Sequence, residues 1–243
     1  YGPLFLTSFG TRTRTSSRPG AGVYLADKTY LFFEIIELTG GGTWDFQSTG
    51  YRLACAEKQS LKFNRIAEAS FPILPHTAIA APDGYVYLYY VGGKYPDGAA
   101  YLARVLPDKI EKPASYEFWA GSRFSSDLKQ SSPLVPKVYG QVSVAWNPYL
   151  ERYVMMHVGG VVEDARKIFI RTSPTPSGPF GEAWKVYGLP GTVQLSPKIE
   201  GRLYCAYLHP ELFQEKGRIM YFTYCIVQDF GTPDLVKLEL KRE

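Results

Sequence analysis

The chain has few residues of the kinds that build metal or redox sites: its 243 residues include three Cys, three His and three Met. Three histidines are too few for a histidine-built metal site, and no Cys-x-x-Cys or Cys/His spacing typical of zinc is present. A P-loop, a dinucleotide fingerprint and a Ser/His/Asp order are absent as well. We therefore predict neither a metal nor a cofactor.

Long apolar runs and a basic stripe are also lacking. The longest apolar stretches have the length of a strand, which is too short to span a membrane as a helix. The net charge is +4, but the basic residues are scattered along the chain rather than clustered. A nucleic-acid partner is therefore not expected.

The three cysteines leave two states open. Cys205 and Cys225 lie on consecutive strands of one expected hairpin, so they could form a disulfide in an oxidising compartment. They could equally be buried thiols that pack as small apolar groups. Cys55 is then left over as a buried strand residue.

Aromatic residues are abundant, with 19 Tyr and 14 Phe, and they occur in short runs bounded by Gly and Pro. This composition is typical of many short strands joined by tight turns. No amphipathic run is long enough to predict a helix. We expect an all-β chain with a single domain over residues 1–243, and the abrupt start at Tyr1 is typical of a processed or truncated chain.

A unit of a short strand, a turn, a long aromatic strand, a loop and a third strand recurs four times. The aromatic strands read TYLFFEII, YVYLYYVG, RYVMMHVG and RIMYFTYC, from Thr29, Tyr85, Arg152 and Arg218. The third strands begin at Tyr51, Ala100, Lys167 and Leu235. Similar sheets repeated at roughly 50 to 70 residues predict the blades of a β-propeller.

The number of blades is left open. Fourth strands are expected at residues 61–66, 116–119 and 183–187, whereas the last unit has none. Residues 3–9 have strand character and could pair with the last blade, which would give four blades and a closing N-terminal strand. Five blades would need a fragmentary blade over residues 3–15, or residues that precede Tyr1.

Binding residues are expected around the axis, because the first strand of each blade and the loop before it face the centre of a propeller. These positions are polar and aromatic, which suits a sugar: aromatic faces stack on the ring while amides and imidazoles bond its hydroxyl groups. The alternative is that these side chains merely fill the axis. The candidates are Arg18, His76, Tyr139, Gln141, Tyr207 and His209.

Three acids near the axis are candidates for glycoside hydrolysis, which needs two carboxyl groups facing one another. Glu34 ends the apolar run YLFFE, where a carboxylate is costly unless it is paired or used. A catalytic role and a structural ion pair are both open for Glu34. Asp45 follows a Gly-rich stretch typical of a loop turn, and Glu211 follows the first strand of the fourth unit.

Several motifs resemble one family. They are YLARVLPDKI (101–110), YEFWAG (116–121), VSVAWNPYLERYVMMHV (142–158), RTSPTPSGPF (171–180) and YLHPELFQEKGRIMYFTY (207–224). They are similar to the secreted five-bladed propellers, long catalogued as a domain of unknown function, that include bacterial endo-D-arabinanases. The resemblance implies a β-propeller fold, an extracellular location and a polysaccharide or glycan partner.

The resemblance also implies two acids near the N-terminus. The family segment Asp-Gly-Ala/Ser corresponds to Gly20-Ala21-Gly22, which holds no acid, and the segment Phe-Gly-Asp-Thr corresponds to residues 32–35, where Glu34 replaces the aspartate. Three hypotheses stay open: a glycoside hydrolase acting on arabinofuranosides or related polysaccharides, a non-catalytic propeller that binds a glycan or a protein, and a structural subunit of an extracellular assembly.

Overall fold

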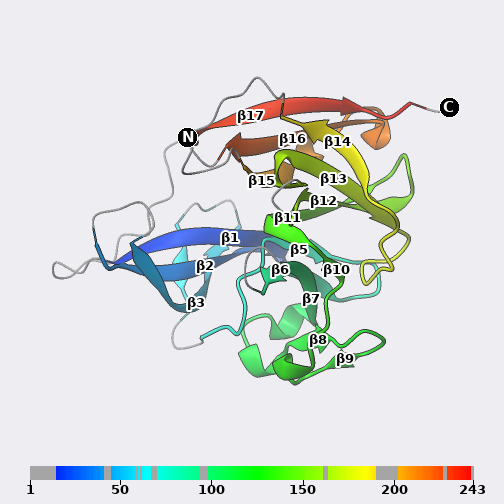
Figure 1. Cartoon of the computed structure of the whole chain (residues 1–243). Helices are drawn as coiled ribbons and strands as arrows, with labels where there is room; N and C mark the ends of the chain where they lie inside the picture. Colours follow the sequence, from blue (N-terminus) through cyan, green and yellow to red (C-terminus); the bar gives the residue numbers. More distant parts are fainter. Residues whose placement is uncertain are drawn as a thin grey trace.

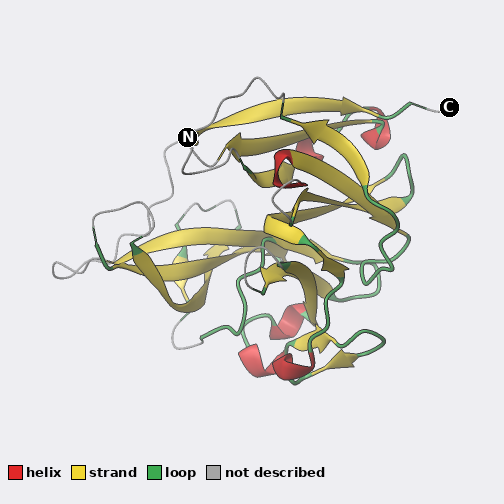
Figure 2. Ribbon diagram, in the orientation of Figure 1, coloured by secondary structure: helices red, strands yellow, loops and turns green. Residues whose placement is uncertain are grey.

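The structure is a computed structural model that describes residues 15–40, 45–58, 60, 62–66, 70–93, 98–160, 164–189, 202–226 and 229–241. Over these residues it is all-β, with short 3₁₀ helices and no α-helix (Figures 1 and 2). Within the described ranges no helix is long and apolar enough to cross a membrane.

Four antiparallel sheets form the four blades of a β-propeller (Figure 1). The first blade contains β1 (Thr15–Leu25), β2 (Lys28–Leu38), β3 (Phe46–Glu57) and β4 (Asn64–Arg65). The second contains β5 (Thr77–Ala80), β6 (Val86–Gly92), β7 (Ala99–Val105), β8 (Glu117–Trp119), β9 (Phe124–Ser125) and β10 (Val135–Pro136). The third contains β11 (Val138–Asn147), β12 (Arg152–Gly159), β13 (Lys167–Ser173) and β14 (Trp184–Gly188).

The fourth blade has three described strands, β15 (Leu203–Leu208), β16 (Ile219–Ile226) and β17 (Asp229–Glu239). The 3₁₀ helices lie in the connections and are η1 (Pro107–Lys109), η2 (Pro113–Ser115), η3 (Leu128–Gln130), η4 (Asp164–Arg166), η5 (Pro210–Leu212) and η6 (Glu215–Gly217).

The predicted propeller is confirmed, with four blades. The strand expected over residues 3–9 and most of the fragmentary blade lie outside the described residues. The connection over residues 120–139 contains β9, η3 and β10, and β10 pairs with the first residues of β7, beyond the residues that pair with β8.

The core consists of three apolar clusters, each between neighbouring blades. Phe32 of β2 packs edge-on against Phe71, and Leu88 of β6 shares their cluster. The five residues from Val86 to Tyr90 are all buried because both faces of β6 are covered by other blades. This explains why the aromatic strands read as continuous apolar runs rather than as alternating ones.

The innermost strands are β1, β5, β11 and β15, and three of them carry a bulge at the same level. The register shifts between Pro19 and Gly22 in β1, between Tyr139 and Val142 in β11, and between Tyr204 and Tyr207 in β15. Bulges bend a strand and re-aim its side chains, and they often lie next to functional sites. Each of these strands therefore has two differently oriented halves, one at each end of the axis.

Candidate functional site

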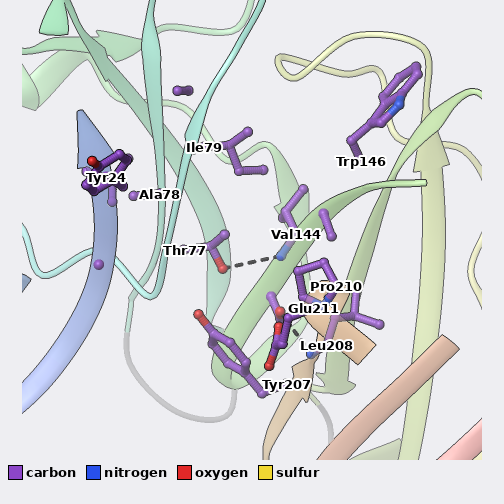
Figure 3. Close-up of a pocket in the computed structure, with 15 residues that line it drawn as sticks. Tyr24, Thr77, Ala78, Ile79, Val144, Trp146, Tyr207, Leu208, Pro210 and Glu211 are labelled. Atoms are coloured by element: carbon purple, nitrogen blue, oxygen red, sulfur yellow. Dashed lines mark hydrogen bonds between the residues drawn. The ribbon is translucent and has the colours of Figure 1, made fainter. Parts of the chain in front are cut away.

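Two cavities lie at opposite ends of the innermost strands. The N-end cavity, of about 390 Å³, includes Arg18, His76 and Gly140 among its lining residues, and these precede or begin the innermost strands. The C-end cavity, of about 530 Å³, is lined by the later parts of the same strands and by Glu211 (Figure 3). Both volumes suit a small organic ligand.

Arg18 and Glu34 form an ion pair in the N-end cavity. They face each other in the β1–β2 ladder, and Arg18 Nε donates a hydrogen bond of 2.9 Å to Glu34 Oε2, to which Nη2 also donates. Glu34 is only 4% exposed, whereas the Arg18 side chain is 45% exposed and lies over the Phe46 ring at 4.6 Å. The cavity therefore presents a guanidinium whose position is fixed by a buried carboxylate and an aromatic face.

His76 lies on the same cavity, immediately before β5. Its backbone N–H donates to Tyr89 O at 2.7 Å, and its carbonyl accepts from the Tyr207 hydroxyl at 3.0 Å. Burial lowers the pKa of His76 to about 4; the charge of Arg18 adds to this lowering, and Glu34 opposes it. The imidazole is therefore neutral near pH 7, and its buried Nδ1 has no hydrogen-bond partner among the described residues.

Tyr139 and Tyr204 lie at the same level on blades three and four. Their rings meet edge to face with centroids 6.0 Å apart. Gly140 between the blades has φ +75°, and a Cβ there would lie 2.9 Å from the Tyr204 ring, so only glycine fits. Burial raises the pKa of Tyr204 to about 12.

The two other candidate acids lie apart from Glu34. Asp45 is exposed and precedes β3, where Phe46 pairs with Leu38, four residues beyond Glu34 along β2. At a rise of about 3.3 Å per residue this separates them by roughly 13 Å. Glu211 lines the C-end cavity. Among the described residues that line the N-end cavity, Glu34 is the one acid.

The remaining candidates divide between the two ends. Tyr207 lines the C-end cavity, although its hydroxyl reaches back to the carbonyl of His76. His209 lies beyond the end of β15 and contacts Glu211 and Thr223. Gln141 is half-buried in the β11 bulge and lines neither cavity.

Tyr51 and Tyr90 line the N-end cavity but were not predicted, because they belong to the third and second strands of their blades rather than to the first. Strand register is the signal that could have identified Tyr51, because Tyr51 lies opposite Glu34 in the β2–β3 ladder.

The cysteines are thiols in the structure, and no disulfide joins the described cysteines. Cys205 lies in the β15 bulge, next to the Tyr204–Cys225 pair of the ladder. Burial raises the pKa of Cys205 to about 12, and nearby Cys225 raises it further. Of the two states that the sequence left open, the structure has the reduced one.

The sequence matches a family model described as "Domain of unknown function (DUF4185)" over residues 15–232. A search of curated proteins gave no match. The family model agrees with the resemblance seen in the sequence motifs at the level of the family.

Solved structures with the same fold include a Bacteroides ovatus protein whose hydrolase assignment is provisional, at TM-score 0.64 and 16% identity, covering 91% of this chain and 59% of that one. They also include an α-L-arabinofuranosidase from Clostridium thermocellum, at TM-score 0.55 and 15% identity, covering 91% and 67%. A GH43_1 enzyme from Xanthomonas citri complexed with xylotriose has TM-score 0.50 and 18% identity, covering 85% and 61%. The chain thus spans 59% of the length of the Bacteroides ovatus protein, and at these identities the likeness shows the fold.

Proposed function

We propose that this chain, which belongs to the DUF4185 family, is a carbohydrate-active propeller that binds a saccharide in the N-end cavity. The glycoside hydrolase propellers among the structural neighbours support this, as does the xylotriose complex of the Xanthomonas citri enzyme. The partner is a polysaccharide or glycan, and the proposal includes an extracellular location, which fractionation of the producing cells would test.

The observation that carries the proposal is the joint presence of Arg18, Glu34 and His76 on one cavity. A sugar hydroxyl both donates and accepts hydrogen bonds, so it can pair with a guanidinium, a carboxylate and a neutral imidazole together. The Arg18 guanidinium is half-exposed and Nδ1 of His76 has no partner among the described residues. The exposed guanidinium can therefore donate to a ligand hydroxyl, and His76 brings an unsatisfied polar side chain to the same cavity.

Binding without hydrolysis is the form of the proposal that the geometry favours. Hydrolysis by paired carboxyl groups needs a second acid across the bond to be cleaved. In the described lining of the N-end cavity, Glu34 stands alone, and Arg18 occupies its Oε2. A carboxylate held in this way can accept hydrogen bonds from a ligand without a partner acid.

Calorimetric titration with neutral arabino- and xylo-oligosaccharides tests binding. Glu34→Gln removes the charge that holds Arg18, and we expect it to lower the affinity at least tenfold. Glu37→Gln on the same strand, whose side chain contacts Gln47 at the exposed end of β2, is the matched control and should bind like the wild type. Absence of binding by the wild type, or equal affinity of the Glu34→Gln variant, would refute the proposal.

Hydrolysis is the second candidate, because Glu34 is a buried carboxylate on a ligand-sized cavity, as a catalytic acid or base would be. Asp97, Glu163 and Glu200 lie outside the described residues, as do the first fourteen residues. Incubation with arabinan and related furanosides, with sugar release measured by chromatography, decides between the two. Release that is lost in Glu34→Gln would establish hydrolysis, and no release from any substrate would leave binding as the function.

A structural role in an extracellular assembly is the remaining hypothesis from the sequence. The described part of the fourth blade ends at β17 without a fourth strand, and such an edge can accept a strand from another chain. Light scattering tests this role: a stable monomer would argue against it.

A further inference from the structure

The C-end cavity is separate from the proposed saccharide site. Its lining comes from the later halves of all four innermost strands, including Tyr24 of β1, Ile79 of β5, Trp146 of β11 and Leu208 of β15. Tyr207 stands between the two cavities, because it lines this one while its hydroxyl donates to the carbonyl of His76. The axis therefore holds a cavity at each end, and the larger of the two has no role in the function proposed above.

Two large aromatic side chains on this cavity are exposed to solvent. Tyr24 is 55% exposed and Trp146 is 43% exposed. Both are held in place: the Tyr24 hydroxyl donates to Asp27 Oδ1 at 2.8 Å, and the Trp146 ring packs edge-on against Tyr153 with centroids 5.0 Å apart. Fixed aromatic rings that face solvent on a cavity are typical of ligand sites.

Figure 3 shows Tyr24 and Trp146 on opposite sides of the cavity with Ile79 between them, and Glu211 and Tyr207 below both rings. Rings arranged in this way cannot both close on one compact group, such as a single ammonium. They can each support one unit of an extended ligand that crosses the cavity.

Glu211 provides a polar anchor whose position is fixed. Its Oε1 lies 2.9 Å from His209 Nδ1, and His209 Nε2 lies 3.0 Å from Thr223 Oγ1. A carboxylate only accepts hydrogen bonds, so Nδ1 donates to it, and in the neutral imidazole Nε2 accepts from the threonine hydroxyl. His209 and Thr223 are thus positioning residues that orient an otherwise exposed carboxylate.

The floor of the cavity offers little polar chemistry to a ligand. The hydroxyl of Thr77 donates to Val142 O at 3.0 Å and accepts from Val144 N at 3.3 Å. The hydroxyl of Ser143 accepts from Leu208 N at 3.0 Å. No Lys or Arg is among the described residues that line the cavity, so an acidic ligand such as a phosphate or a uronate would meet only Glu211 and be repelled.

We propose that the C-end cavity is a second saccharide site, which binds a neutral oligosaccharide of two or more units across Tyr24 and Trp146, with Glu211 accepting hydrogen bonds from its hydroxyl groups. Aromatic faces with a few placed polar groups are the chemistry that recognises such a ligand. The proposal does not depend on the N-end cavity. Because the sites lie at opposite ends of the axis, one molecule could hold two glycan chains.

Tryptophan fluorescence titration with neutral arabino-, xylo- and gluco-oligosaccharides tests the proposal in the full chain. We expect Tyr24→Ala to weaken the binding that Trp146 fluorescence reports at least tenfold, and Trp146→Ala to remove the fluorescence change itself. Trp184→Ala is the matched control, because Trp184 is 56% exposed on β14 and lies outside the cavity. Glu34→Gln should leave this binding unchanged, so the test separates failure here from failure of the N-end cavity.

Glu211→Gln provides a second variant on an exposed position, which should not disturb folding. We expect it to weaken the same binding several-fold, and His209→Ala to do so in part. Equal affinity of the wild type, Tyr24→Ala and Glu211→Gln would overturn the proposal. Binding of glucosamine oligomers with no binding of neutral ones would also overturn it, in favour of a cation site.

Discussion

Two buried histidines should make the propeller lose stability between about pH 6.5 and pH 4. Burial lowers the pKa of both His76 and His157 from 6.5 to about 4. His157 lies in β12, stacks on Phe169, and receives a hydrogen bond of 3.3 Å from Arg171 Nε to its Nε2. Arg171 also lowers the pKa of His157, whereas the bond to the Val158 carbonyl raises it.

The direction follows from proton binding. Below pH 6.5 the unfolded chain takes up a proton on each of these imidazoles, whereas the folded chain does so only near pH 4. The free energy of unfolding therefore falls as the pH is lowered through this window. For a pKa of about 4 in the folded state, each imidazole contributes a loss of about 2 kcal/mol at pH 5 and about 3 kcal/mol at complete protonation.

Urea denaturation at several pH values between 7.5 and 4.5 measures this loss. The wild type should lose about 4 kcal/mol between pH 7.5 and pH 5 from the two imidazoles together, and His157→Gln should lose about 2 kcal/mol less over the same range. Carboxylates that titrate below pH 5 affect both chains alike and cancel in the difference. An equal pH dependence in the wild type, His157→Gln and His76→Gln would refute the reasoning.

Three other predictions test how the innermost strands are held. Asn147 is buried, donates a hydrogen bond to Gly217 O at 2.8 Å and accepts from the backbone N–H groups of Tyr149 and Leu150 at 2.9 Å. Asn147→Ala should therefore lower the free energy of unfolding, measured by urea denaturation, by about 3 kcal/mol. Asn64→Ala is the control, because Asn64 is exposed and its replacement should leave the free energy of unfolding unchanged. Gly140→Ala should lower the free energy of unfolding by about 2 kcal/mol and weaken saccharide binding. Gly84 has φ +89° and open space around it, so Gly84→Ala should show the effect of backbone strain alone. Cys205 should react slowly with a thiol reagent in the native protein, because burial raises its pKa to about 12, as peptide mass spectrometry would show; labelling as fast as that of the unfolded chain would contradict the raised pKa.

The strands could be predicted from the sequence because their residues repeat. The aromatic runs that begin at Thr29, Tyr85, Arg152 and Arg218 correspond to β2, β6, β12 and β16. The packing between blades could be predicted only in part. The continuous apolar run of β6 indicates that both faces of this strand are covered, but it does not indicate which residues cover them.

The Arg18–Glu34 pair could not be predicted, because it depends on a bulge. Near the turn, Gly22 pairs with Leu31, and an uninterrupted ladder would place Arg18 opposite Ile35. The bulge between Pro19 and Gly22 shifts the register by one residue and brings Arg18 opposite Glu34. Gly20 and Gly140 mark two of the three bulges in the sequence, but the third, at Cys205, has no glycine.

The separation of the candidates into two cavities was also beyond the sequence. The sequence places these candidates around one axis but does not say at which end: Glu211 follows Tyr204 by seven residues and lies at the C-end cavity, whereas Tyr204 contacts Gly140 at the N-end cavity. Which end a residue faces depends on where each strand crosses its neighbours, and that is set by packing between blades.

Nitrogen NMR of the histidine side chains during titration with neutral oligosaccharides tests the saccharide site most directly. With three histidines in the chain, each imidazole gives a separable signal. The proposed site predicts that the His76 nitrogens shift on binding, because a ligand in the N-end cavity changes the surroundings of the imidazole that lines it, while those of His157, in the interior of blade three, stay unchanged. Saturable binding that leaves the His76 signals in place would contradict it.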